Sequence, residues 1–145
     1  MTQQRYDEAI ALYQEYLTLS PGSAGVHHNL GLALFSTGKE AEALPEFERA
    51  VVLNPSDPSL RLSLGNALAS TDQLDEAIGQ YRTGLELNPA DARMMSALGL
   101  ALAFSGEIDE SLAIFRRALE LDPDNPDIQS DYAMATRLRV TAPQR

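Results

Sequence analysis

The sequence contains 145 residues, of which 44% are hydrophobic and 6% aromatic, and its formal net charge is −10 at pH 7. This charge argues against nucleic acid as a partner, because phosphate binding needs a clustered basic surface, and the absence of cysteine excludes disulfides and thiolate chemistry. No apolar run approaches the roughly 18 residues of a membrane span, and no secretory signal is visible. We therefore expect a cytoplasmic protein without membrane association.

The first predicted element is an amphipathic helix over residues 4–20, within the stretch RYDEAIALYQEYLTLSP. Its apolar side chains are spaced three and four residues apart, which places them on one stripe of the helix. The residues of this stripe are Tyr6, Ala9, Ile10, Tyr13, Tyr16 and Leu17. Such a stripe predicts that part of this helix packs onto the next one, which starts near Ala24.

From residue 24 onward the sequence repeats itself every 34 residues. The recurring Leu-Gly segments are Leu30 to Leu34, Leu64 to Leu68 and Leu98 to Leu102, and the recurring prolines are Pro21, Pro55, Pro89 and Pro123. Two residues after these prolines stand Ser23, Asp57, Asp91 and Asn125. All four are residue types that accept hydrogen bonds from the free N–H groups of a first helical turn. Each period thus has a fixed stop and a fixed start.

Each period is predicted to hold two helices. The first helix of a period, here called a first-type helix, begins near Ala24, Pro58, Ala92 and Pro126 and breaks at Thr37-Gly38, Thr71-Asp72 and Ser105-Gly106. The second-type helix carries a small, an aromatic and a small residue in turn: Ala43, Phe47 and Ala50, then Ala77, Tyr81 and Gly84, then Ser111, Phe115 and Ala118. Small residues let two backbones approach closely while the aromatic ring fills the space between them, so we expect antiparallel helix pairs.

This pattern resembles the tetratricopeptide repeat family over nearly the whole chain. The family's consensus positions fall on Leu30, Gly31, Leu34, Ala43, Phe47, Ala50 and Pro55 in the first complete unit, and on their equivalents in the next two. The departures are Gly84 and Ser111 in place of Ala, and His27, Arg61 and Met95 in place of a frequent Trp. The resemblance implies an all-α fold, an α-solenoid of antiparallel helix pairs wound as a right-handed superhelix, with about three and a half repeats plus a C-terminal capping helix.

We expect a single repeat domain over residues 1–145. Its predicted parts are a lone second-type helix at 4–20, three complete repeats at 24–57, 58–91 and 92–125, a capping helix at 126–139 and a polar tail at 140–145. The last helix suits a cap because its outer face is largely polar.

The sequence shows no catalytic or metal-binding pattern, so we predict neither an enzyme nor a cofactor. His27 and His28 are neighbours on a helix and point about 100° apart, so they cannot share one metal ion. Lys39, in the stretch STGKE, is followed by Glu40 rather than Ser or Thr and has no strand before it, so it does not form a phosphate-binding loop. No nucleophile with an adjacent base is apparent.

The family resemblance instead implies a concave groove built from the first-type helices. The groove residues that we predict are His28, Asn29, Leu32, Phe35, Leu62, Ser63, Asn66, Arg93, Ser96, Leu100, Phe104 and Met134. This lining is apolar with a few amide and hydroxyl groups, a mixture suited to an extended peptide or an amphipathic helix. Of the positions that hold acidic C-termini in some family members (His28, Leu32, Ser63, Arg93 and Ala97), only Arg93 is the required cation. A neutral or basic segment is therefore favoured over an acidic one.

The leading hypothesis is a non-catalytic protein-interaction scaffold, and two alternatives stay open. One is a self-assembling module, for instance a homodimer through the N-terminal helix, with Tyr6, Ile10, Tyr13, Tyr16 and Leu17 at the interface. Tyr16 occupies the position of Ala50, Gly84 and Ala118, which indicates that no first-type helix of its own repeat presses there and that the missing half is absent by design. The other alternative is the recognition arm of a larger enzyme.

Overall fold

The computed structural model describes residues 3–141, and within that range the chain forms α-helices and no β-strand. The helices are α1 (Gln3–Leu19), α2 (Ala24–Ser36), α3 (Glu40–Leu53), α4 (Pro58–Ser70), α5 (Leu74–Leu87), α6 (Ala92–Ser105), α7 (Ile108–Leu121) and α8 (Pro126–Thr141). The predicted all-α class is confirmed. Residues 142–145, most of the predicted polar tail, lie outside the described residues.

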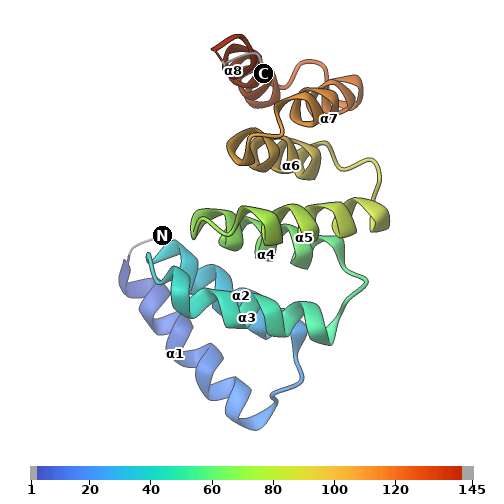
Figure 1. The fold of residues 1–145 in the computed structure, drawn as a ribbon. Coiled ribbons are helices and arrows are strands. Elements are labelled where there is room, and N and C mark those ends of the chain that lie inside the picture. Colours follow the sequence, from blue (N-terminus) through green and yellow to red (C-terminus); the bar gives the residue numbers. More distant parts are fainter. Residues whose placement is uncertain (1–2, 142–145) are drawn as a thin grey trace. The chain divides into compact units, whose positions relative to one another are not determined.

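The helices form two compact units, Met1–Asp72 with α1 to α4 and Gln73–Arg145 with α5 to α8. In the first unit α2 contacts both α1 and α3, and α4 packs on α3 with a smaller contact to α2. In the second unit α6 contacts both α5 and α7, and α8 packs on α7 and also touches α6. Within each unit, helices that follow one another in sequence therefore lie side by side (Figure 1).

Four helices begin at the predicted capping residues. The first-turn N–H groups of α2, α4, α6 and α8 donate to the side chains of Ser23 (3.4 Å), Asp57 (2.9 Å), Asp91 (2.9 Å) and Asn125 (3.1 Å). At Asp57 the hydroxyl of Ser59 also donates to the carboxylate, and this bond lowers the pKa of Asp57. These bonds satisfy donors that have no partner inside the helix, which explains where the first-type helices start.

In the first unit, a glycine on the first-type helix faces an aromatic ring on the second-type helix. Phe47 of α3 is almost fully buried, and Ala43 and Ala50 on either side of it are completely buried. A Cβ atom added to Gly31 of α2 would lie 2.7 Å from the Phe47 ring, closer than carbon atoms approach without displacement. The close approach of α2 and α3 therefore requires glycine at position 31.

The second unit repeats this contact with α6 and α7. A Cβ atom at Gly99 would lie 2.8 Å from the ring of Phe115, which is fully buried. Ser111, the departure from the family's Ala, is also fully buried, and its Oγ donates a hydrogen bond of 2.6 Å to the carbonyl oxygen of Gly99. A buried hydroxyl is tolerated here because this bond offsets its loss of water.

The turns after three first-type helices use the left-handed backbone region. Gly38 has a φ of 76° and Gly106 a φ of 91°, and the residue at the matching position of the middle repeat is Asp72, with a φ of 62°. Glycine adopts this region freely, whereas a residue with a Cβ pays a steric cost that is moderate for Asp.

We expect the substitution Asp72→Gly to stabilise the protein. Removing the Cβ relieves the steric cost of the left-handed conformation, and the gain should exceed the extra entropy of an unfolded glycine by about 0.5–1 kcal/mol. Urea unfolding followed by circular dichroism would measure the difference. A lower free energy of unfolding for the variant would contradict this expectation. It would show that the Asp72 side chain stabilises the folded protein by more than the steric cost of its left-handed backbone conformation.

Candidate functional site

In the first unit, a small pocket of about 90 Å³ lies on the first-type helices α2 and α4. Its lining residues are Leu32, Phe35, Phe47, Ser63 and Asn66. All of them except Phe47 belong to the predicted groove. The pocket combines apolar walls with one hydroxyl and one amide, groups that can bind the backbone of an extended segment.

His28 stands at the edge of this pocket and links its two helices. Its Nε2 lies 2.8 Å from Oγ of Ser63 on α4, and its ring packs against Phe47 with a centroid distance of 5.9 Å. Burial lowers the pKa of His28, although the negative charge of Asp57 acts in the opposite direction. The neutral imidazole is therefore the form that the folded protein favours.

This lowered pKa predicts that His28 makes the protein less stable in mild acid. As the pH falls below the ordinary histidine pKa of about 6.5, the unfolded chain binds a proton at His28 more readily than the folded chain does, so stability is lost. The variant His28→Gln lacks this titration. We expect the parent to lose more free energy of unfolding than His28→Gln between pH 7.5 and pH 5.5, as measured by urea unfolding. Equal losses would contradict the assignment.

In the second unit, a pocket of about 320 Å³ lies where the start of α8 meets α6. Its lining residues are Arg93, Ser96, Ala97, Leu100, Asn125, Asp127 and Ile128. Ser96 Oγ donates a hydrogen bond of 3.1 Å to Asp131, whose pKa is raised by burial. The lining thus holds three of the predicted groove residues, Arg93, Ser96 and Leu100, together with Asn125, for which the sequence predicts only a capping role.

The other predicted groove residues do not share these two pockets. Leu62 is buried and offers little surface to a ligand, and Met134 is half-buried. Phe104 is 64% exposed on α6, outside the pocket lining. Asn29 lines a third pocket, between α1 and α2.

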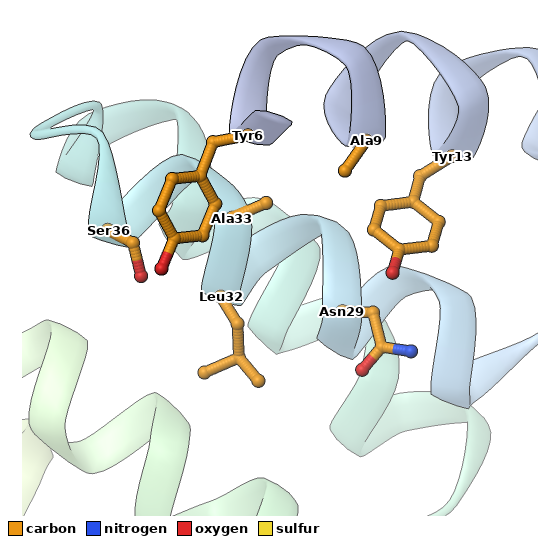
Figure 2. A pocket seen from close by; sticks show the side chains of 7 residues that line it. All are labelled: Tyr6, Ala9, Tyr13, Asn29, Leu32, Ala33 and Ser36. Atoms are coloured by element: carbon orange, nitrogen blue, oxygen red, sulfur yellow. The ribbon is translucent and has the colours of Figure 1, made fainter. Parts of the chain in front are cut away.

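That third pocket, of about 340 Å³, belongs to the first unit (Figure 2). Tyr6, Ala9 and Tyr13 line it from α1, and Asn29, Leu32, Ala33 and Ser36 line it from α2. Of the residues predicted for a homotypic contact, Tyr6 and Tyr13 line this pocket, Ile10 is buried, Leu17 is half-buried and Tyr16 is exposed. Ile10 therefore has little surface left for a second subunit.

Neither a cluster of metal-ligating side chains nor a membrane-spanning helix is found within residues 3–141. Within residues 3–141, no group of three or more His, Asp or Glu side chains is arranged to hold a metal ion. His27, one of the two histidines, contacts Glu46 through Nδ1 (2.6 Å) and the carbonyl oxygen of Pro21 through Nε2 (3.0 Å). In the same range, no helix has both the length and the apolar character needed to cross a membrane.

A search of curated proteins found no match. Among solved structures, the chain is similar to MamA, with 22% identity and a TM-score of 0.88 over 93% of this chain and 79% of MamA. It is also similar to YrrB, described as a TPR protein with an unusual peptide-binding site, with 24% identity and a TM-score of 0.83 over 97% of this chain and 72% of that one. The first TPR of Spaghetti (RPAP3), bound to the HSP90 peptide SRMEEVD, shows 21% identity and a TM-score of 0.77 over 81% of this chain and 94% of that one.

These likenesses confirm the predicted α-solenoid of helix pairs. At the level of sequence, the family model named Tetratricopeptide repeat matches residues 1–58, 28–84 and 62–126, which together span most of the chain. The chain therefore belongs to the tetratricopeptide repeat family.

Proposed function

We propose that this protein is a non-catalytic interaction scaffold that holds a peptide or helical segment of a partner protein on its first-type helices. The observation that carries the proposal is that each unit has a pocket on these helices, lined by Leu32, Ser63 and Asn66 in one unit and by Ser96 and Leu100 in the other. Peptide ligands of two relatives of the same fold, YrrB and the first TPR of Spaghetti, support the same use of the fold.

The charges favour a neutral or basic segment. The formal net charge of −10 repels an acidic ligand at long range. Asp127 lines the pocket of the second unit and Asp131 lies beside it, bonded to Ser96, whereas Arg93 is the only cation in the lining of either pocket. A ligand of the type SRMEEVD, which carries three carboxylate side chains, would find few cations here.

A selection from a random peptide library on the immobilised protein would test the proposal. We expect selected peptides to bind the parent in fluorescence anisotropy. Each peptide should bind at least about tenfold more weakly to the variant whose pocket it occupies, Leu32→Asp in the first unit or Leu100→Asp in the second. Leu32 is 42% exposed, so a carboxylate placed there should disturb the ligand more than the fold.

Leu87→Asp is the matched control for Leu32→Asp, because Leu87 is 43% exposed but lies on the second-type helix α5. Circular dichroism should show the parent's helicity in all three variants. The proposal fails if no peptide is selected, or if the peptides bind the Leu32 and Leu100 variants as tightly as the Leu87 variant.

A further inference from the structure

The helix α1 has the residues of a second-type helix but is less covered than its counterparts. Ala9 and Tyr13 match Ala43 and Phe47 of α3 in the 34-residue spacing. In α3 these positions are buried beneath α2, whereas Ala9 and Tyr13 are only half-buried. Within the described residues of the first unit, α1 contacts α2 alone, whereas α3 contacts both α2 and α4, so this side of α1 lacks the cover that α3 receives.

The uncovered side of α1 is a continuous apolar stripe. Leu12 is 65% exposed, Tyr16 49% and Leu19 84%, and their spacing of four and three residues places them on one side of the helix, next to Ala9 and Tyr13. These five residues are called the open face below. Exposed apolar stripes of this size are uncommon on surfaces without a partner.

The pocket between α1 and α2 lies where a first-type helix would touch both (Figure 2). On its α2 side it is lined by Asn29 and Leu32. The equivalent residues 34 positions later, Ser63 and Asn66 of α4, line the pocket that α4 shares with α2. In the first unit, α4 faces α2 with Ser63 and Asn66. The α2 side of the pocket therefore has the surface with which α2 would face a first-type helix placed before it.

A helix that fills this place needs a small residue at its centre. Where first-type helices pack on an aromatic ring in this protein, they do so with Gly31 and Gly99, and a Cβ atom there would meet the ring within 3 Å. The ring at the equivalent place of α1 is that of Tyr13. Glycine, or alanine with a small shift of the half-buried Tyr13 ring, suits the position opposite it.

A second copy of the chain fits this place poorly. The first-type helix with an exposed side is α8. Its Ala133 could lie opposite Tyr13, but Gln129 and Thr136, four positions before it and three after it, are polar and would lose water against the apolar open face. Pairing of two α1 helices would bring bulky Tyr13 and Tyr16 to the position that calls for glycine. It would also bring together the two exposed acidic residues on this side of α1.

Those acidic residues, Glu8 and Glu15, decide the charge of the ligand. They lie seven residues apart, so both border the open face on the same side, next to Leu12. A partner helix with Lys or Arg along that edge would gain electrostatic attraction, whereas an acidic edge would be repelled.

We propose that the open face binds an amphipathic helix of another protein, with glycine or alanine opposite Tyr13, apolar residues three and four positions away, and Lys or Arg beside Glu8 and Glu15. This site borders one pocket of the proposed function, because Leu32 lines both. Leu12 lines neither pocket of the proposed function and Leu100 does not belong to the open face, so variants at these two positions distinguish the two proposals.

The probe for this site is a fluorescein-labelled peptide with the sequence of residues 92–105, the α6 helix, extended by two lysines at each end. It carries the glycine that packs on Phe115 in the folded protein. We expect saturable binding by anisotropy, at least about tenfold weaker with the protein variant Leu12→Asp. Binding should weaken similarly for a peptide with the change Gly99→Val and for the protein variant Glu8→Lys combined with Glu15→Lys.

Val52→Asp is the matched control, since Val52 is 68% exposed on α3 and should leave binding unchanged. The proposal is overturned if the peptide does not bind, or if Leu12→Asp binds it like the parent. It is also overturned if the parent forms dimers in sedimentation, if the variant Leu12→Asp does not form them, and if added peptide fails to dissociate the parent dimers. The occupant of the open face is then a second copy of the chain. Library peptides that lose binding with Leu100→Asp but not with Leu12→Asp would support the proposed function alone.

Discussion

Replacing Phe115 by Ala is expected to lower the free energy of unfolding by about 3–5 kcal/mol, the usual cost of removing a buried aromatic ring. The Phe115 ring is fully buried in the core of the second unit. It touches Gly99 of α6 and lies 6.5 Å, edge to face, from the ring of Tyr132 on α8. Three helices therefore lose contacts at once, and α6 cannot collapse far into the space because its backbone already approaches α7 closely.

The matched control for this prediction is Phe104→Ala. Phe104 has the same side chain and is 64% exposed on α6, so its removal should change stability by no more than about 0.5 kcal/mol. Urea unfolding followed by circular dichroism would measure both variants. Similar losses for the two would show that the ring of Phe115 does not organise the core of this unit.

The 34-residue spacing predicted the elements of the fold well because their determinants are local. Capping residues such as Ser23 and Asp91 set helix starts through bonds within one turn. The predicted helices at 4–20 and 126–139 correspond to α1 (Gln3–Leu19) and α8 (Pro126–Thr141). The division of residues 1–145 into one domain of repeats stays a prediction, since the structure presents two units that are each compact.

The candidate site could be predicted only in part. The spacing of residues predicts on which side of a helix a side chain lies, but not how far neighbouring side chains bury it. Leu62 shares the spacing of His28, yet it is buried while His28 reaches Ser63. The bond between Ser111 and Gly99 joins residues of two helices and has no signature in either one. Asn125 was identified as a cap, but its place in a pocket depends on how α8 meets α6.

A glycine inside a helix has two opposing effects on stability: it weakens the helix itself, and it permits close packing such as that between Gly99 and Phe115. Glycine weakens a helix interior by up to about 1 kcal/mol relative to Ala, so a substitution at an open position should stabilise the protein. Gly79 of α5 is such a position, because a Cβ atom there would meet nothing within 4 Å. Gly79→Ala is therefore expected to raise the free energy of unfolding by about 0.5–1 kcal/mol.

At Gly99 the free-energy cost of overpacking the Phe115 ring should exceed the gain in helix stability from replacing glycine. The substitution Gly99→Val places branched carbon atoms where even a single Cβ would lie 2.8 Å from the Phe115 ring, and overpacking of this kind costs about 1–3 kcal/mol. We expect a net loss of about 2–3 kcal/mol in urea unfolding. If the ring is the cause, the loss from Gly99→Val will be smaller in a Phe115→Leu background, because the coupling between neighbouring sites appears as non-additivity. Additive losses would place the cost of Gly99→Val in α6 itself, and glycine would then be needed for a reason other than close contact with the aromatic ring.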